Sequence, residues 1–433
     1  MAEQSIQDPF DTRLGGLLRA YGDEAVGRFE AALIADVAIT RGLRSISILE
    51  RLRAVAPTLR LVAVAAVLGL ALAVAVLLVG SLPPSDPSHI VYVRSGDVFV
   101  TDGQGGHRQL IAAGHADANQ LGYLSADLSP DGSRVAAVLG LSTRLTVDIL
   151  AVTGGVHGTF SPTTDGLGVQ ATWSPDGRHV AVVTGPGRDE ISDLFVLGPD
   201  GGLERTLPWP EGFLSYEPIV SWSPDGRWIL VTGCPCPYTS RGLWIVSPDG
   251  STTRQLAESA GAVWKAVWSP DGGRIAFAAN GLWVAKIDGQ ARHLVPPSRT
   301  ENTYIAGLGW SPDGRWIAMT IGDPTSVHET GTETFALVVV SVADGSMRTL
   351  VSGTASKTVA WDGRIVDWHV LSGEAMVDGP YGDWPKWTPD SRAILYDSIA
   401  VGETYPAVRR ISLDGSASTI VIPEIDQGFD VAS

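Results

Sequence analysis

The feature that most constrains the fold is a five-residue motif that the chain repeats six times. Trp-Ser-Pro-Asp-Gly occupies residues 173–177, 222–226, 268–272 and 310–314, and variants of it occupy 128–132 and 387–391. The motif prolines lie at positions 130, 175, 224, 270, 312 and 389, which gives intervals of 45, 49, 46, 42 and 77 residues. A period of about 40–50 residues with strand-like patterning is typical of a β-propeller.

Each period has the same internal order. An apolar segment leads into the motif, a second segment such as "RWIAMT" follows it, a third such as "GLWIVSPDG" ends in a turn, and a fourth such as "TTRQL" closes the unit. This pattern predicts a blade of four short strands. The chain is therefore expected to be an all-β protein.

The motif itself predicts the turn between the first two strands. Proline presets φ at the first central turn position, aspartate can bond the backbone just beyond it, and glycine accepts a positive φ. The tryptophan is a large ring suited to packing between blades. We therefore expect structural turn roles, and no catalytic role, for the motif aspartates Asp131, Asp176, Asp225, Asp271, Asp313 and Asp390.

The number of blades depends on the two ends of the repeat region. Residues 89–110 offer the second, third and fourth strands of a blade, and "QGFDVAS" at 427–433 can supply its first strand. Joining the chain ends in one blade leaves no exposed edge in the ring. Seven blades are favoured, with six or eight as alternatives, because residues 358–377 read as an insertion hairpin or a degenerate eighth blade.

These repeats resemble the TolB-like, WD-type propeller family over roughly residues 89–423. The resemblance rests on "WSPDG", the apolar strand after it and the "LWIVSPDG" strand, and it implies the propeller fold without a particular activity. Residues 128–132 lack the tryptophan, 387–391 lack the glycine, and the stretch around 357–380 departs from the repeat.

A membrane span is expected before the propeller. Residues 61–82 carry no charge, and a helix of this length reaches the roughly 30 Å of a hydrocarbon core. Arg41, Arg44, Arg51, Arg53 and Arg60 precede the segment, whereas only Arg94 follows it closely. The positive-inside rule then predicts a single-pass protein with a cytoplasmic N-terminus and an extracytoplasmic propeller.

The expected domain order follows from this span. Residues 1–60 are predicted to be a cytoplasmic helical segment, 61–82 a transmembrane helix, 83–88 a linker and 89–433 the propeller. Mild amphipathic periodicity in residues 1–60 suits either a docking segment for a cytoplasmic partner or a simple tail.

All of the formal charge of −16 lies in residues 83–433, where 23 basic residues face 39 acidic ones. Such an acidic domain repels phosphate backbones, so nucleic acid is not an expected partner.

The sequence offers no motif for catalysis, a metal or a cofactor. It has no G-x-S-x-G, H-E-x-x-H, P-loop or EF-hand pattern, and its eight histidines have no metal-ligand spacing. The chain is therefore predicted to be neither an enzyme nor a holder of a cofactor or metal. Cys234 and Cys236 are compatible with a strained local disulfide, free thiols, pairing with another protein, or a soft metal.

Recognition is expected on one face of the ring. The motif turns and the "DGG/DGS" turns leave one face, while long irregular loops leave the other, and such loops on a rigid scaffold commonly bind partners. Candidate contacts with a protein, peptide or glycan are Trp209, Phe213, Tyr216, Tyr238, Tyr304, Trp368, Tyr381 and Trp384. The alternative for each ring is that it packs under its own loop.

Three functions are therefore considered. The favoured one is a non-catalytic, membrane-anchored binding module. The second is a transmembrane signal transducer that acts through residues 1–60. The third is a propeller-type lyase or hydrolase, which would require His, Tyr, Arg and carboxylate groups to converge at the channel mouth.

Overall fold

The computed structural model describes residues between His89 and Val431. The described ranges are 89–114, 120–141, 144–162, 169–185, 193–210, 215–235, 243–256, 263, 265–296, 304–323, 332–359, 365–376, 385–403, 405–416, 418–423, 425 and 427–431. The predictions for residues 1–60, 61–82 and 83–88 lie outside these ranges. Within the ranges, no helix has the length and apolar character needed to cross a membrane.

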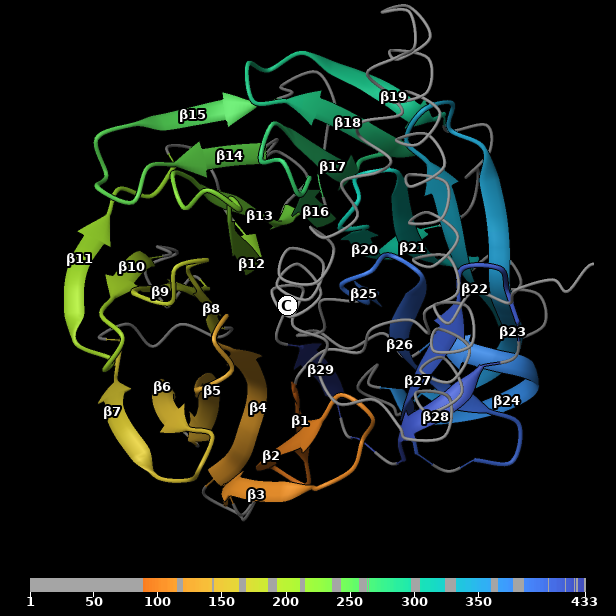
Figure 1. Cartoon of the computed structure of the whole chain (residues 1–433), viewed down its shortest axis with the longest axis horizontal. Helices are drawn as coiled ribbons and strands as arrows, with labels where there is room; N and C mark the ends of the chain where they lie inside the picture. Colours follow the sequence, from red (N-terminus) through yellow and green to blue (C-terminus); the bar gives the residue numbers. More distant parts are fainter. Residues whose placement is uncertain are drawn as a thin grey trace, which may run out of the picture. The chain divides into compact units, whose positions relative to one another are not determined.

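The described strands form a ring of seven blades, each with four antiparallel strands (Figure 1). From the inner strand outward, blade 1 contains β29 (Gln427–Val431), β1 (His89–Arg94), β2 (Asp97–Asp102) and β3 (Gln109–Ala112), and blade 2 contains β4 (Gln120–Leu128), β5 (Arg134–Leu141), β6 (Arg144–Ala151) and β7 (Val156–Phe160). Blade 3 contains β8 (Val169–Trp173), β9 (Val180–Thr184), β10 (Asp193–Leu197) and β11 (Leu203–Leu207). Blade 4 contains β12 (Ser215–Trp222), β13 (Ile229–Pro235), β14 (Leu243–Val246) and β15 (Thr253–Leu256).

Blades 5 to 7 follow the same order. Blade 5 contains β16 (Lys265–Trp268), β17 (Arg274–Ala278), β18 (Leu282–Lys286) and β19 (Ala291–Val295). Blade 6 contains β20 (Tyr304–Trp310), β21 (Trp316–Asp323), β22 (Thr332–Ser341) and β23 (Met347–Val359). Blade 7 contains β25 (Lys386–Trp387), β26 (Ala393–Ala400), β27 (Ala407–Ser412) and β28 (Thr419–Ile422). The prediction of an all-β propeller with seven four-stranded blades is confirmed. The six-blade alternative is wrong, because residues 89–110 and β29 together form a complete blade. The eight-blade alternative is wrong, because residues 365–376 form one added strand and not a separate blade.

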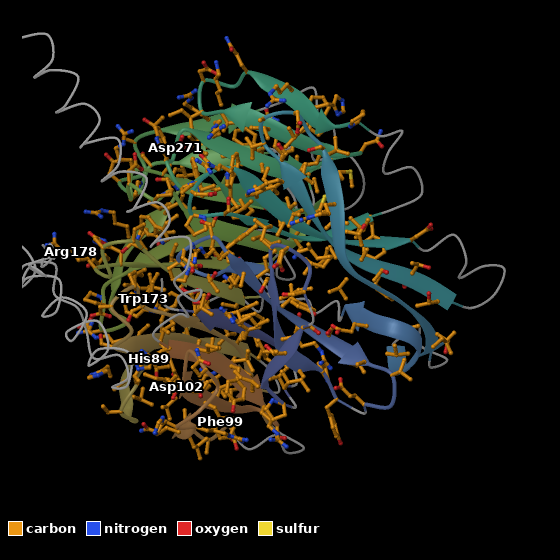
Figure 2. The ribbon with its side chains drawn as sticks, turned by 45° about the vertical axis from the view of Figure 1, so that its right-hand side comes forward. His89, Phe99, Asp102, Trp173, Arg178 and Asp271 are labelled. Atoms are coloured by element: carbon orange, nitrogen blue, oxygen red, sulfur yellow. The ribbon has the colours of Figure 1, made fainter. Side chains whose placement is uncertain are left out.

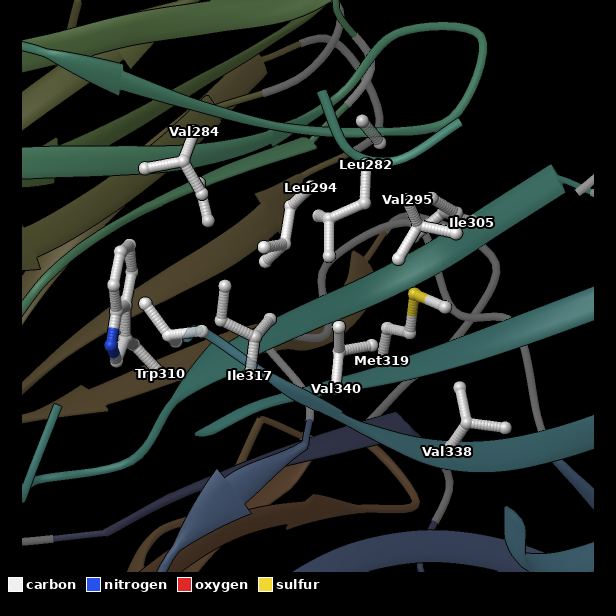
Figure 3. Packing of buried hydrophobic residues seen from close by; sticks show 13 residues of the cluster. Leu282, Val284, Leu294, Val295, Ile305, Trp310, Ile317, Met319, Val338 and Val340 are labelled. Carbon is white, nitrogen blue, oxygen red and sulfur yellow. The ribbon is translucent and has the colours of Figure 1, made fainter. Parts of the chain in front are cut away.

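The core consists of seven apolar clusters, one between each pair of neighbouring blades. The five motif tryptophans each pack against the preceding blade and are only 5–7% exposed. Trp310 of blade 6, for example, joins Val284 and Leu294 of blade 5 (Figure 3). Leu128 takes this position in blade 2, where the motif lacks the tryptophan. The motif therefore repeats because every blade needs both the same turn and the same ring.

Both ends of the repeat region build blade 1, as the sequence predicts. β29 pairs antiparallel with β1, and Phe429 is buried in the cluster between blades 7 and 1. Asp430 then reaches both neighbouring blades. Its Oδ1 lies 2.9 Å from Lys386 Nζ of blade 7, and its Oδ2 accepts a 3.0 Å hydrogen bond from the Leu128 amide of blade 2. A single carboxylate thus connects three blades at the point where the ring closes.

The motif turns share one hydrogen-bond pattern. In all six, the serine or threonine hydroxyl donates to the aspartate at 2.5–2.7 Å, and the amide two residues beyond the aspartate donates to the same oxygen at 3.0–3.1 Å. The residue after the aspartate has a positive φ of 62–71°. This residue is glycine in five turns and Ser391 in the variant motif, so the variant keeps the turn at some conformational cost.

We expect this pattern to be measurable as a depressed carboxyl pKa at Asp249, in the turn between β14 and β15. Hydrogen bonds from the Ser247 hydroxyl and from Ser251 lower its pKa from 3.8 to about 2. Because the folded pKa lies below the unfolded one, the turn stabilises the fold above pH about 4 and loses this contribution as pH falls toward 2. Ser247→Ala should move the pKa back toward 3.8. An NMR titration of the Asp249 carboxyl carbon checks this, and a wild-type midpoint near 3.8 would contradict it.

Blade 6 departs from the four-stranded pattern through a fifth strand, β24 (Ile365–Met376). β24 pairs with the far half of β23 and then, at Glu374–Met376, with the end of β26 in blade 7 (Figure 1). Blades 6 and 7 thereby share one sheet. The predicted insertion hairpin is therefore the correct alternative. At its root Gly353 faces Gly373, and a Cβ at Gly353 would lie only 2.4 Å from the Glu374 carbonyl oxygen.

Candidate functional site

The antiparallel strand order gives the ring two different faces. Turns from the first to the second strand and from the third to the fourth leave one face, which we call the turn face. Asp102, Arg178 and Asp271 lie along this side of the ring (Figure 2). The second-to-third-strand connections and the links between blades leave the opposite face, which we call the loop face. The second-to-third-strand connections and the links between blades, which the sequence predicts to be long and irregular, therefore belong to the loop face.

Both ends of the described chain lie at the turn face. His89 pairs with Asp102, where β2 runs into its turn, and Val431 pairs with Ile90 beside it.

The predicted aromatic contacts are only partly within the described residues. Phe213, Tyr238, Tyr381 and Trp384 lie outside them, as does Cys236. Tyr216, Trp368 and Cys234 lie in β12, β24 and β13, but their side chains are outside the described part. Side-chain positions are thus available for Trp209 and Tyr304 among the eight candidates.

Trp209 and Tyr304 are held by the protein and do not meet each other. Trp209 packs against the cluster between blades 3 and 4. Tyr304, at the start of β20 in blade 6, donates a 2.5 Å hydrogen bond to Glu333, which is fully buried. Both side chains therefore have internal contacts within the described residues.

The Tyr304 ring lies directly over a glycine of the neighbouring strand. A Cβ added at Gly322 would meet Tyr304 Cζ at 2.5 Å. We expect Gly322→Ala to displace the ring and lower the free energy of unfolding by about 1–3 kcal/mol, as overpacking does. Adding Tyr304→Ala should make the alanine at 322 nearly neutral, because the clash is gone. Urea unfolding of the four variants measures this coupling, and simple additivity would contradict it.

Within the described residues, a connected set of charged and hydroxyl side chains lies at the root of the β23–β24 hairpin, and we call it the hairpin lock. It consists of Glu374, Tyr396, Ser398, Glu403, Arg409 and Ser418. Tyr396 Oη and Ser398 Oγ donate to Glu374 Oε2 at 2.8 and 2.9 Å. Ser418 Oγ donates to Glu374 Oε1 at 2.7 Å.

One guanidinium connects the two carboxylates of the lock. Arg409 Nε lies 3.5 Å from Glu374 Oε2 and donates to Ser398 Oγ at 3.0 Å, while Arg409 Nη2 donates to Glu403. The Arg409 side chain is only 6% exposed. A buried guanidinium needs such partners, because an unpaired charge away from water is strongly destabilising.

The surroundings shift the pKa values of two lock residues in opposite directions. Burial, reinforced by the negative charge of Glu374, raises the pKa of the Tyr396 hydroxyl well above its usual range. Burial opposes ionisation of Glu403, but hydrogen bonds from Arg409 and from the Ala400 amide outweigh it and lower the pKa of Glu403. Tyr396 is therefore a neutral donor and Glu403 an anion at neutral pH.

The hairpin lock contains residue types that can catalyse reactions, but its contacts connect β24 to blade 7. The hydroxyls and the guanidinium donate to groups inside the cluster, and Tyr396 and Ser398 are fully buried. In the described part of the chain, no three His, Cys, Asp or Glu side chains gather as a metal site.

Sequence reasoning missed the hairpin lock because its members do not repeat. Glu374 and Arg409 belong to "LSGEAM" and "AVRRIS", which carry no motif. The available signal was the departure of residues 357–380 from the repeat. That departure identified the segment as irregular without showing which charges would anchor it.

No protein-family model matches the sequence, and no curated protein matches it. Among solved structures, TolB from Acinetobacter baumannii shares 13% identity at a TM-score of 0.46, over 83% of this chain and 70% of its own. The periplasmic gluconolactonase PpgL of Pseudomonas aeruginosa shares 14% identity at a TM-score of 0.47, over 79% of this chain and 98% of its own.

Hydrazine synthase of Kuenenia stuttgartiensis is similar to the same degree. It shares 14% identity at a TM-score of 0.44, over 69% of this chain and 98% of its own. Proteins with different functions share this likeness, and it concerns the fold alone. The resemblance to TolB and other propellers expected from the repeats is confirmed at that level.

Proposed function

We propose that the chain is a non-catalytic binding module that recognises a protein, peptide or glycan through the loop face of its propeller. The observation that carries this proposal is the contrast between the two faces. Turn-face connections are short and their aspartates are occupied by hydrogen bonds within the turn. The loop face carries the long connections and the β23–β24 hairpin, a departure from the blade pattern that the ion pairs of Arg409 hold in place.

The proposal includes a membrane anchor at residues 61–82, with residues 1–60 cytoplasmic and the propeller extracytoplasmic. The uncharged segment and the arginines before it support this arrangement. A natural extension is a signal transducer in which residues 1–60 contact a cytoplasmic partner. Removing residues 1–60 should leave partner binding by the propeller intact in either case, but it should abolish signalling only in the second.

Absence of catalysis is also part of the proposal. The alternative of a lyase or hydrolase requires acid, base and cation groups that face a substrate. The hairpin lock holds its tyrosine, arginine and carboxylates against one another, with Tyr396 and Arg409 buried. This arrangement favours a structural role.

The experiment is affinity capture with quantitative mass spectrometry on the full-length protein. One variant, which we call the loop-face variant because it tests the proposed recognition face, carries Phe213→Ala, Tyr216→Ala and Tyr238→Ala at three of the sequence-predicted contacts. The matched control carries Arg178→Ala and Arg315→Ala on the turn face, where both side chains are 80% exposed. Thermal unfolding must be unchanged in both variants, so that loss of a partner reflects lost contact residues and not a lost fold.

A partner that the loop-face variant loses and the turn-face variant keeps supports the proposal. A partner that both variants keep, but that a chain without residues 1–60 loses, would move the function to the N-terminal segment. If neither the wild-type protein nor any variant captures a specific partner, the binding-module proposal is wrong.

A further inference from the structure

Among the described strands, only part of one edge of β24 is paired. β24 pairs with β23 from Ile365 to Gly373, and its other edge meets β26 only at Glu374–Met376. Along 365–373, no strand within the described ranges pairs with that second edge. In an antiparallel sheet, alternate residues direct their N–H and C=O groups to each edge. An open edge of this length is a template for one more strand.

Exposed apolar side chains occur in β24 and in the connection that follows Ala400, a residue that pairs with β24. Leu371 is 55% exposed, three residues before Glu374 in β24. Val401 and Tyr405, 58% and 55% exposed, lie in the connection after Ala400, the residue that pairs with Glu374. The other large apolar side chains exposed to this degree in the described residues lie one to a blade, on the fourth strands: Leu110, Val156, Leu203 and Ile420.

The edge is also rigidly supported. Glu374, the residue at which β24 passes from β23 to β26, is bonded to Tyr396, Ser398 and Ser418 of blade 7. A strand that is already ordered loses little conformational entropy when a partner adds to it. The hairpin lock therefore lowers the entropic cost of adding a strand to this edge.

Charge decides which kind of strand fits. Residues 83–433 carry the whole formal charge of −16, and the lock beside the edge holds two carboxylates for one guanidinium. A second copy of the same propeller would be repelled, whereas a basic segment would be attracted. Resting on the proposed function, we propose that the open edge of β24 binds an extended, basic and alternately apolar peptide segment of a partner protein as an added strand.

The test measures binding of an acetylated and amidated peptide of alternating lysine and valine to the full-length protein. The variant Leu371→Lys/Val401→Lys/Tyr405→Lys removes the apolar side chains and adds three positive charges. Its charge-matched control is Leu110→Lys/Val156→Lys/Leu203→Lys, at sites of similar exposure on other blades. We expect the peptide affinity to fall at least about tenfold in the first variant and to change less than about twofold in the control.

Two further readouts identify strand addition. Methylating alternate peptide amides should abolish binding, because the main-chain donors are lost, and glutamate in place of lysine should do the same through charge. Hydrogen exchange at residues 365–373 should slow when the unmodified peptide binds. Equal affinity for the two lysine variants, binding that survives amide methylation, or no binding of the unmodified peptide would each overturn the proposal.

The outcome separates this inference from the proposed function. If the peptide does not bind but affinity capture still finds a partner that depends on the loop face, strand addition is wrong and the binding module stands. If affinity capture finds no such partner, the binding module itself is wrong.

Discussion

A chain that ends at residue 426 is expected to lose the cooperative unfolding of the propeller. The truncation removes β29, and with it the buried Phe429 and the contacts of Asp430 with blades 7 and 2. Loss of a buried phenylalanine alone costs about 3–5 kcal/mol. The missing strand ladder and the lost ion pair between Asp430 and Lys386 add to this, and the sum is comparable with the total stability of a typical protein, about 5–15 kcal/mol.

The matched control is a chain that ends at Val431 and keeps all of β29. It should unfold at the same temperature as the full-length protein. Phe429→Ala should lie between the two, with a free energy of unfolding reduced by about 3–5 kcal/mol. Scanning calorimetry and urea unfolding provide these values. If the chain ending at residue 426 unfolds as cooperatively as the control, β29 does not close the ring.

Replacing Arg409 by methionine is expected to lower the free energy of unfolding by about 3–5 kcal/mol at neutral pH, because breaking a buried ion pair leaves uncompensated charge. In the hairpin lock, two carboxylates would then face each other without a cation. Arg178→Met is the matched control. Its side chain is 80% exposed and its ion pair measures 4.0 Å, so its removal should cost less than about 0.5 kcal/mol.

The dependence on pH distinguishes loss of charge pairing from loss of packing. In the wild-type protein the pKa of Glu403 is lowered, so this group stabilises the fold above its unfolded pKa and loses that contribution as pH falls. In Arg409→Met the same carboxyl should have a raised pKa, and its contribution is then retained at low pH and lost as pH rises. The stability difference between the two proteins should therefore shrink from pH 7 toward pH 4. A difference that is independent of pH would show that packing alone is responsible.

The blades could be predicted from the sequence because every unit solves the same local problem. Trp222 and Trp268, for example, occupy equivalent positions and both donate their indole N–H to a carbonyl of the preceding blade, at Thr172 and Ser221. The role of "QGFDVAS" was also predictable, since a blade without a first strand needs one. Repetition converts a fold into a pattern that is visible along the chain.

A second repeated signal was present but not recognised. The fourth strands "TTRQL" and "ARHLV" carry Arg254 and Arg292, which donate to the Ile287 and Val342 carbonyl oxygens of the next blade at 2.8 and 3.2 Å. The same arginine recurs in "LERTL" and "MRTLV". An arginine at a fixed position on an outer strand was thus a readable indication of contacts between blades.

The candidate site was much harder to predict. Glu374 and Arg409 meet because β24 leaves blade 6 and pairs with blade 7, which no local pattern encodes. Tyr304 was singled out as an exposed aromatic, yet its hydroxyl is bonded to the buried Glu333. Aromatic composition indicates a ring that needs a contact, but only the tertiary structure shows whether the contact is internal.

Site-specific photo-crosslinking in intact cells distinguishes recognition through the loop face from recognition through the turn face. A photoreactive amino acid is placed in the full-length chain at Leu371 or Tyr405 on the loop face, and at Arg178 or Arg315 on the turn face, all exposed positions. If the loop face is the recognition surface, adducts with a defined partner should form from positions 371 and 405 and not from 178 and 315. Adducts that form only from the turn face, or equally from both faces, would contradict the account.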